Sequence, residues 1–373
     1  MKYTIRETAG RRDLGRFIRF PHRVYRGHPN WVPPLDVELR RKLDPRRNPF
    51  FEYGQAKLFQ ALDETGKPAG RIAAVHNPLH REVHGEPAGF FGLFECVDDA
   101  GAARVLFEAT KGYLGGFGCR VVLGPVNFST NDDSGMLVEG HDERPMILCN
   151  YSPPYYPDLL AACGFEKAVD LLAYRGIVSH AFPPKYEAVA RRAEADGAIR
   201  LRPFDRRLLD RDSELIGRIY NESFRDVWGF VPLSGPEALA LGRSFAAFSD
   251  DRLVWIAEHN GEPAGFILAL PDINEVLKDM GGRLLSFGIF RLLVRPRTRG
   301  IRVIALGVVP SRRRLGIETL LIRKVHEGMQ AGGYREAEFS VVMENNRRMR
   351  NLLENVGFEP AKRYRIFRSP VLA

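Results

Sequence analysis

The sequence predicts an α/β chain of two tandem domains, each a mixed, mostly antiparallel sheet flanked by helices. The length of 373 residues suits two domains of roughly 100–200 residues each. Separate stretches of the first half recur in the second half at nearly constant spacing. Within each half, apolar strand-like stretches alternate with helical ones, which indicates an α/β architecture.

The first recurring stretch is a hairpin. "ETGKPAGRIAAV" (64–75) resembles "HNGEPAGFILAL" (259–270), and an apolar stretch precedes each one. A turn with glycine and proline between two apolar stretches is a hairpin signal. Gly265 lies 195 residues after Gly70.

The second recurring stretch is a helix that ends at a glycine before a strand. "LLAACGFEKAVDLLAYRG" (159–176) resembles "LLENVGFEPAKRYRIFRS" (352–369), with Gly357 lying 193 residues after Gly164. "LGGFGCRVVLGP" (114–125) also resembles "AGGYREAEFSVV" (331–342), but at a spacing of 217 residues. Segments recurring at such spacings indicate a tandem duplication.

Insertions explain the change of spacing. The second copy carries about 22 extra residues before this point, and the first about 24 after it. We assign them to 271–300 and 127–149, and insertions of this length are usually functional loops. Each copy then reads as strand, strand, long helix, strand, helix, strand. We place the domains at 1–180 and 181–373, with 185–198 as a linking helix.

Composition narrows the class of protein. Hydrophobic residues at 45% and charged residues at 27% are typical of soluble globular chains. Four widely separated cysteines predict reduced thiols in the cytoplasm. The N-terminus lacks the apolar core of a signal peptide, and no segment is apolar enough to span a membrane, which leaves surface attachment open. The net charge of +9 favours anionic partners.

The stretch "VVPSRRRLGIETLL" (308–321) is the clearest candidate for binding an anion. It reads as a short apolar strand, a basic turn with Gly316, and an amphipathic helix. The N-terminus of a helix leaves backbone N–H groups unpaired, and glycine permits close approach. Arg312, Arg313 and Arg314 add positive charge, so the stretch predicts a pyrophosphate site. The alternative is a solvated basic turn.

This order of strand, V-x-P, R-x-x-G-x and helix resembles the GNAT acyltransferase superfamily, and "NNRRMRNLLENVGFE" resembles its final helix. The resemblance covers 251–373 well and implies that acyl-CoA binds there without a metal. The first copy has no arginine turn and looks degenerate for cofactor binding. The residues that the resemblance assigns to the cofactor are Leu306, Val308, Val309, Arg312, Arg313, Arg314, Leu315, Gly316, Ile317 and Asn346.

A narrower resemblance extends over nearly the whole chain. The stretches "FPHRVYRGHPNWVPPL", "GPVNFSTNDDSG", "NYSPPYY" and "GVVPSRRRLGIE" are similar to a family of double GNAT proteins associated with bacterial ceramide synthases. That family shares the G-I-D/E ending, so Glu318 agrees with it. We expect the Glu318 side chain to face away from the phosphates.

The resemblance also implies the chemistry of direct acyl transfer. A base removes a proton from the amine, backbone N–H groups stabilise the oxyanion, and an acid protonates the leaving thiolate. The oxyanion donor is the N–H of Val308 or Val309. The superfamily places its acid, a tyrosine, where this chain has Leu353, so that assignment does not transfer to this chain.

Three residues are candidates for the proton transfers. Tyr364 is a substitute for the missing acid, with core packing as the alternative. Glu344, at the end of a strand, is the candidate base, with capping of the next helix as the alternative. Asp132 is a second candidate base if the active site forms between the copies.

The polar insertion of the first copy predicts the acceptor site. Turn-forming residues explain part of its composition, but functional loops look the same. The residues that we assign to acceptor binding are Asn127, Ser129, Asn150, Tyr155 and Tyr156.

A row of spaced histidines and a segment rich in leucine and arginine each have a functional and a simpler explanation. His76, His80 and His84 are spaced four apart, but Pro78 discourages a regular helix across them, so we assign them no metal. The segment 283–299 mixes leucine and phenylalanine with arginine. It suits either a membrane-surface element or a helix that covers the protein's own core.

These features predict an acyl-CoA-dependent N-acyltransferase that acylates the amine of a sphingoid base. The C-terminal domain is expected to bind acyl-CoA and the N-terminal domain to shape the acceptor site. The alternatives are acetylation of a small amine or amino acid, and an inactive acyl-CoA-binding protein. A nucleic-acid binder is disfavoured because no stacking or helix-turn-helix motif accompanies the charge. We expect a cytoplasmic protein, with membrane contact through 283–299 left open.

Overall fold

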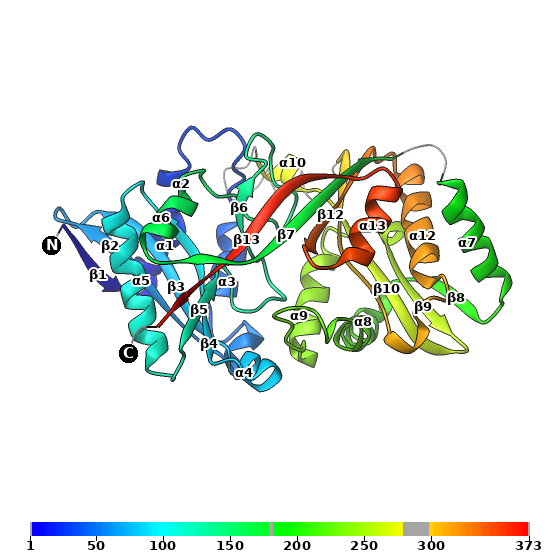
Figure 1. Ribbon diagram of the computed structural model, residues 1–373, viewed down its shortest axis with the longest axis horizontal. Coiled ribbons are helices and arrows are strands. Elements are labelled where there is room, and N and C mark those ends of the chain that lie inside the picture. The colour runs from blue at the N-terminus through cyan, green and yellow to red at the C-terminus, as the bar shows by residue number, and fades with distance from the viewer. Residues whose placement is uncertain (1, 179–181, 279–297, 372–373) are drawn as a thin grey trace. The chain divides into compact units, whose positions relative to one another are not determined.

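The computed structural model describes residues 2–178, 182–278 and 298–371, which form two compact units (Figure 1). The first unit contains residues 2–171, 277–278 and 362–371, and the second contains 172–178, 182–276 and 298–361. Apart from residues 277–278, the chain leaves the first unit within β7 (Glu166–Ile177) and returns to it within β13 (Glu359–Pro370). The division into functional domains 1–180 and 181–373 stays a prediction.

The sheet of the first unit is mixed and mostly antiparallel. Its order is β1-β2-β3-β4-β5-β13, with β6 pairing with β13. β4 and β5 are parallel, whereas β1 to β4 and the pairs with β13 are antiparallel. The strands before β13 are β1 (Tyr3–Glu7), β2 (Gln55–Asp63), β3 (Pro68–His76), β4 (Ala88–Cys96), β5 (Val121–Gly124) and β6 (Met136–Glu139).

The long helix α5 (Ala100–Gly115) packs on this sheet. Its residues Leu106 and Phe107 join Ile72 and Phe91 of the strands in one buried cluster. Helical spacing of apolar residues places them on one face, which is why this segment forms an amphipathic helix. The other helices are α1 (Gly10–Arg19), α2 (Pro21–Val24), α3 (Asp36–Lys42), α4 (Pro78–His84), α6 (Tyr156–Ala162) and the 3-10 turn Pro49–Glu52.

The sheet of the second unit repeats this arrangement. Its order is β7-β12-β11-β10-β9-β8, with β8 to β11 antiparallel and β11 parallel to β12. The strands are β8 (Ile199–Pro203), β9 (Val254–His259), β10 (Glu262–Pro271), β11 (Gly300–Val308) and β12 (Glu336–Met343), together with the part of β7 that lies in this unit.

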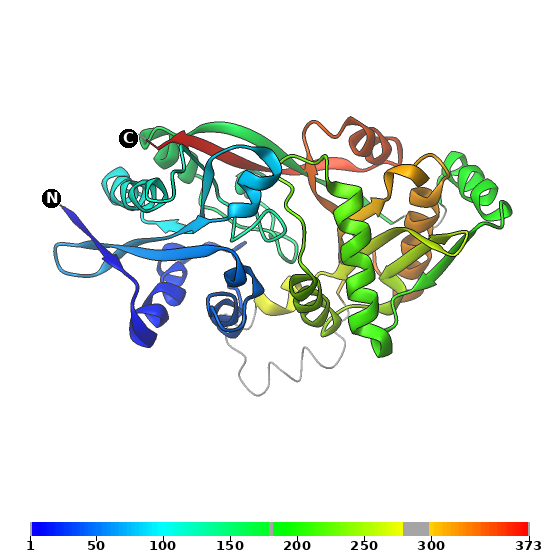
Figure 2. The same cartoon turned by 90° about the horizontal axis from the view of Figure 1, so that it is seen from below.

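Helices cover both faces of the second sheet (Figures 1 and 2). Ile267 and Val303 pack with α12 (Ile317–Gly332), whereas Phe266 and Ala305 pack with α8 (Leu209–Phe224). Because neighbouring strand residues face opposite sides, α8 and α12 lie on opposite faces. The other helices are α7 (Pro184–Ala195), α9 (Gly235–Ala246), α10 (Asn274–Leu277), α13 (Arg347–Asn355) and the 3-10 turns Arg206–Leu208, Asp251–Leu253 and Pro310–Arg312.

The predicted fold class is confirmed, but the repeat-based order omitted two strands before the long helix of each copy. These are β1 and β4 before α5 in the first copy, and β8 and β11 before α12 in the second. They were omitted because only the elements around the matching glycines were aligned; the strand before the arginine turn was recognised separately. The insertion at 271–300 lies largely outside the described residues.

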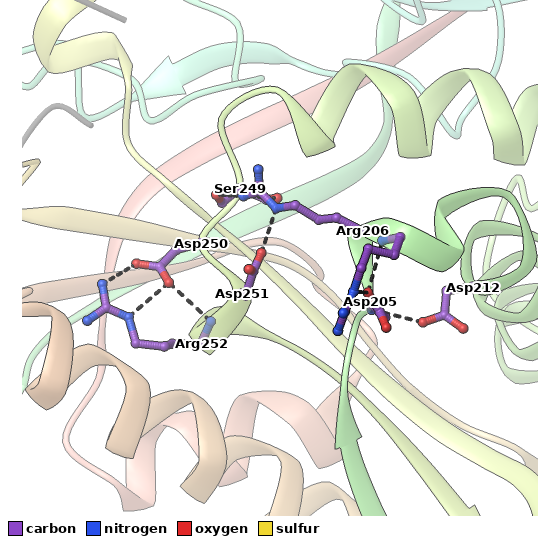
Figure 3. A network of polar contacts seen from close by, with 8 residues as sticks. Asp205, Arg206, Asp212, Ser249, Asp250, Asp251 and Arg252 are labelled. Carbon is purple, nitrogen blue, oxygen red and sulfur yellow. Dashed lines mark hydrogen bonds and ion pairs between the residues drawn. The ribbon is translucent and has the colours of Figure 1, made fainter. Parts of the chain in front are cut away.

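A polar network fastens α8 to the edge of the second sheet (Figure 3). Asp212 of α8 is fully buried and accepts hydrogen bonds from Arg202 Nη1 and Nη2 at 2.7 and 2.8 Å. The backbone N–H of Asp205 also donates to it at 3.0 Å. Beside it, Arg206 donates to Asp251 at 2.6 Å. A buried carboxylate with several donors is a structural anchor.

Replacing Asp212 with alanine is expected to lower the free energy of unfolding by about 3 kcal/mol, because Arg202 would lose its buried partner. Chemical denaturation of the full chain measures this change. Arg243→Ala is the matched control. Arg243 of α9 pairs with Asp210, which lies on α8 like Asp212, and both side chains of this pair are more than half exposed. That control is expected to cost less than about 1 kcal/mol. Equal losses in the two variants would contradict the anchoring role.

Candidate functional site

The two parallel strands of the second sheet part after four residues. β11 and β12 pair only from Gly300↔Glu336 to Val303↔Phe339, although the strands continue to Val308 and Met343. On its other side, β11 stays paired with β10 as far as Val308. The register shifts between Leu268 and Ala269, which leaves Ile304 as an extra residue in β11. Such a bulge bends a strand, and here it accompanies the parting.

Antiparallel alternation shows which backbone groups of β11 face β12. The N–H of Val309 donates to the carbonyl of Ala264 at 3.0 Å, so the Val309–Ala264 pair is hydrogen-bonded. The next pair, Val308↔Gly265, is then a non-hydrogen-bonded pair, and the Val308 N–H is directed away from β10. Of the two expected oxyanion donors, Val309 is therefore already committed and Val308 remains.

The helix that follows β11 begins without a cap. No side chain among the described residues caps α12, and none of them offers an acceptor to the N–H groups of Ile317, Glu318 and Thr319. The N-cap residue Gly316 has φ +82°, and a Cβ there would lie 2.9 Å from the Cβ of Ala193. Glycine is therefore required by both conformation and packing. An uncapped helix start attracts anions.

The three arginines of this turn have different surroundings. Arg313 donates from Nη2 to the carbonyl of Ser223 at 2.9 Å and from Nε to that of Val308 at 3.3 Å. It ties the turn to the last residues of α8. Within the part of the chain that the structure describes, the side chains of Arg312 and Arg314 make no hydrogen bond or ion pair. Arg314 is exposed and is the freer cation for a phosphate.

A fourth arginine joins this group from α13. Burial, together with the charges of Arg313 and Arg314, lowers the pKa of Arg348. Arg348 donates through Nη2 to Oε1 of Glu318, so the negative charge in the first turn of α12 has a cationic partner. Sequence reasoning missed Arg348; the signal was the basic start of the final helix, "NNRRMR".

The other predicted cofactor residues surround the same turn. Val308, Val309 and Ile317 are buried, Leu306 packs against the core cluster, and Leu315 is exposed. Asn346 has a structural task, because its side chain caps α13 by accepting from the N–H of Met349 at 3.1 Å. Capping of this helix was the alternative role that we predicted for Glu344.

The candidate base Glu344 follows β12 directly and is half-buried. Its carbonyl accepts from Arg350 Nη1 at 2.8 Å. Leu353, the residue that stands where the resemblance expects a tyrosine, is buried in the core. Beside it, Tyr174 donates its hydroxyl to Glu354 of α13 at 2.8 Å, a phenol that the sequence did not indicate. Tyr364 belongs to the first unit, where it is buried and lies opposite Leu137 of β6.

The first unit has a similar parting of parallel strands, but its own loop fills the space. β4 and β5 pair from Ala88↔Val121 to Phe90↔Leu123 only. Beyond them, Asn127 Oδ1 accepts from the N–H of Leu93 at 2.9 Å. A Cβ at Gly92 would lie 2.5 Å from the carbonyl oxygen of Val126, so the loop backbone packs directly on β4.

The helix start of the first unit is occupied as well. Asp99 caps α5 by accepting from the N–H of Gly101 at 2.8 Å and of Ala102 at 3.3 Å. Lys2 and Tyr3 also donate to Asp99 at 2.6 and 2.9 Å. A carboxylate therefore already holds the position that a phosphate would need, which disfavours a second anion there.

The second candidate base, Asp132, and the predicted acceptor residues have structural partners within the first unit. Asp132 forms an ion pair with Lys42 at 2.8 Å; although burial disfavours the charge of Lys42, Asp132 and its neighbour Asp133 raise the pKa of this lysine. Ser129 accepts from the N–H of Asn131 at 3.1 Å, and Asn150 donates to the carbonyl of Gly135 at 2.8 Å. Their roles in acceptor binding stay predictions.

Tyr155 and Tyr156 converge on the end of β4. Tyr155 donates to the carbonyl of Cys96 at 2.8 Å, and Tyr156 donates to Glu95 Oε2 at 2.7 Å. Burial raises the pKa of Glu95 to about 7, although Arg71 and Tyr156 favour its charged form. Arg71 Nη2 lies 3.8 Å from Glu95 Oε1. Sequence reasoning missed this buried acid because β4 itself was missed.

The three spaced histidines contact neighbouring side chains, and the ring of His84 lies 4.7 Å from that of His80. His76 stacks on Phe117, and His80 Nε2 lies 3.2 Å from Glu86 Oε2. Helix α4 does form here, with Pro78 at its first position, where proline is tolerated. The described residues contain no group of three or more His, Cys, Asp or Glu side chains that could hold a metal ion.

Comparison with known proteins agrees with this geometry. The model of the acetyltransferase (GNAT) family matches residues 214–358, which include the parted strands, the arginine turn and α12. The protein is thus a GNAT-type acyltransferase, a class that uses an acyl-CoA and an amine acceptor.

Full-length relatives narrow the assignment. The "Bacterial ceramide synthase" of Caulobacter vibrioides is 34% identical over 95% of this chain and 94% of its own. The "Protein YghO" of Escherichia coli is 31% identical over 98% of this chain and 95% of its own. The chain belongs to the family of double GNAT proteins that these two relatives represent.

Solved structures show the same tandem fold. A tandem GNAT protein from the clavulanic acid biosynthesis pathway aligns with 100% of this chain and 99% of its own, at a TM-score of 0.58 and 13% identity. A GCN5-related N-acetyltransferase from Sphaerobacter thermophilus aligns with a TM-score of 0.55 at 13% identity. At this identity the likeness concerns the fold alone. In the described segments, no helix is long and apolar enough to cross a bilayer.

Removing the charge of Arg314 is expected to raise the dissociation constant of acyl-CoA about tenfold, because one charge-assisted contact to a phosphate would be lost. Isothermal titration calorimetry of Arg314→Ala measures this, with Arg335→Ala, an exposed arginine beyond the other end of α12, as the control. Arg313→Ala is expected to lower stability too, since two carbonyls lose their donor. If Arg314→Ala and Arg313→Ala both bind acyl-CoA as tightly as wild type does, this stretch is only a solvated turn.

The raised pKa of Glu95 predicts a pH-dependent contribution to stability. The folded chain binds this proton more tightly than the unfolded chain, whose glutamate pKa is about 4.3. The contribution is therefore complete below that pH and is lost as the pH rises to about 7. We expect the difference in unfolding free energy between wild type and Glu95→Gln to change by about 2–3 kcal/mol between pH 5 and 8, to the disadvantage of wild type. Parallel pH profiles would contradict it.

Proposed function

We propose that this acyltransferase transfers a long-chain fatty acyl group from CoA to the amine of a sphingoid base, which gives a ceramide-type amide. The observation that carries the proposal is the 34% identity, over nearly the full length of both chains, to a relative named bacterial ceramide synthase. The GNAT class supplies the acyl-CoA and the amine; the relative supports the lipid nature of the acceptor.

The second unit supports the position of the cofactor. Pyrophosphate would lie at the uncapped start of α12, near Arg314 and Arg348, and the pantetheine arm would follow the unpaired edge of β11. Among the described residues of the first unit, Asp99 caps the corresponding helix and Asn127 accepts from the strand edge, so the same positions are already occupied there. We therefore assign acyl-CoA to domain 181–373 and acceptor-binding residues to domain 1–180.

The reaction needs two proton transfers and one oxyanion site. The acceptor amine gives up a proton, its nitrogen bonds to the thioester carbon, and the C–S bond breaks to release CoA. We assign the oxyanion to the N–H of Val308, a preorganised donor at an unpaired strand edge. Glu344 is the proposed base, because it follows β12 at the open end of the gap, whereas Asp132 is held by Lys42. Tyr364 is the candidate acid that protonates the leaving thiolate.

Two features favour the alternatives. Three solved structures of the same fold are named N-acetyltransferases, so transfer of an acetyl group to a small amine is the alternative activity. Leu353 in place of a tyrosine favours an acyl-CoA-binding protein without turnover. The proposed membrane-surface contact through 283–299 falls almost entirely outside the described residues. A cytoplasmic location is part of the proposal, supported by four free cysteines.

The decisive measurement is release of CoA thiol from matched pairs of substrates. We expect release from palmitoyl-CoA with sphinganine or 3-ketosphinganine, and none from acetyl-CoA with a polyamine. Glu344→Gln is expected to lower kcat at least about a hundredfold while acyl-CoA affinity is retained, because general-base catalysis contributes that much. Turnover restricted to acetyl-CoA and small amines would refute the lipid substrate, and binding without turnover would favour the inactive alternative.

A further inference from the structure

In the second unit, the first carbonyl of β12 beyond the parallel β11–β12 ladder accepts hydrogen bonds from a side chain. The last backbone pair is Val303↔Phe339, and Ser340 is the next residue of β12. Arg302 of β11 donates to the carbonyl of Ser340 from Nε at 3.2 Å and from Nη2 at 3.0 Å. Buried carbonyls need a donor, and here the guanidinium is that donor at the first position beyond the ladder.

A hydroxyl and a carboxylate complete the arrangement. Nε of Arg302 also reaches Ser340 Oγ at 3.0 Å, and this hydroxyl donates to Glu338 Oε1 at 2.8 Å. Arg302 and Glu338 are cross-strand neighbours in the ladder, and both are buried, with Glu338 fully inaccessible. Because strand residues two apart share a face, Glu338 and Ser340 lie on the same face of β12. The Ser340 hydroxyl thus links the guanidinium of Arg302 to the carboxylate of Glu338, so neither buried group is left without a polar partner.

This cluster has no part in the chemistry assigned above. Glu338 is inaccessible, so it has no direct route to a substrate amine. Burying two charges is costly in free energy, and a pair of apolar side chains would give the sheet equal or greater stability. What distinguishes the pair is its position, since it lies where the two strands stop pairing.

We infer that Arg302 is a positioning residue that holds β11 and β12 apart. By occupying the Ser340 carbonyl, it prevents this group from joining a further ladder step and keeps the unpaired edge of β11 free. The inference rests on the proposed binding of acyl-CoA along that edge. It names the residue that keeps the gap available, whichever acyl group or acceptor the enzyme uses.

The test replaces both buried charges, so that neither is left uncompensated. Arg302→Met with Glu338→Met is expected to fold, to slow amide hydrogen exchange in 304–308 and 341–343, and to raise the dissociation constant of coenzyme A at least about tenfold. Hydrogen exchange needs no ligand, so it separates this inference from the proposed function. Unchanged exchange in a folded variant would overturn the inference even if acyl-CoA does not bind at all.

An ion pair between β7 and the paired start of β12 provides the control. Arg175 donates from Nε to Glu336 Oε2 at 3.0 Å, and Glu336 lies at the paired start of β12. Arg175→Met with Glu336→Met is expected to leave the exchange of 304–308 and the coenzyme A affinity within about twofold of wild type. An equal change in this control would show a general effect of removing charge from the sheet and would overturn the assignment.

Conservative single variants keep the test decisive if the double variant fails to fold. Arg302→Lys retains the charge but has one nitrogen in place of the fork that reaches both the carbonyl and the hydroxyl. It is expected to raise the coenzyme A dissociation constant about fivefold or more. Ser340→Ala retains the backbone carbonyl and is expected to change it less than twofold. Unchanged affinity in Arg302→Lys, or the larger effect in Ser340→Ala, would overturn the inference.

Discussion

The second unit depends on a single constraint, the parting of two parallel strands directly before an uncapped helix. Ile304 is the extra residue that disturbs the β10–β11 register, and the β11–β12 ladder ends at the preceding residue. The same strand then leads into the turn at Gly316 and the free N–H groups of α12. One short segment therefore presents both an unpaired strand edge and the positive end of a helix dipole, which suits a long ligand with an anionic end.

In the first unit, two side chains bind the backbone groups that correspond to the unpaired strand edge and helix start of the second unit. The strands of the first unit part in the same way, but Asn127 takes up the N–H of Leu93 and Asp99 caps the helix. Each of these two side chains accepts a hydrogen bond from a backbone N–H group that a ligand would otherwise bind. These donors of the first unit are therefore satisfied without a ligand. The duplicated domains differ less in architecture than in which donors remain free.

The fold could be predicted from the sequence because glycine turns and apolar periodicity are local signals. Gly66 and Gly261 in the hairpins, and Gly164 and Gly357 after the helices, all have positive φ. Glycine marks such turns whatever the rest of the chain does, so their repetition reveals the duplication. The roles of polar side chains depend on partners distant in the chain. Arg313 and Asn346 carry the expected chemistry, yet one binds the carbonyl of Ser223 and the other caps α13. Residue type indicated where the site lies but not which donors remain available.

Like the backbone donors, some of the arginine side chains near the turn already bind groups of the protein itself. A turn with three arginines suggests a strongly cationic cradle, but Arg313 is held by carbonyls and Arg348 by Glu318. A carboxylate next to a phosphate site would repel its ligand, whereas a carboxylate that pairs with an arginine orients that arginine and removes the repulsion. A guanidinium has five donors, and Glu318 accepts from one nitrogen of Arg348, so the remaining donors can bind a phosphate. Glu318 is thus compatible with the proposed anion site, because Arg348 pairs with it.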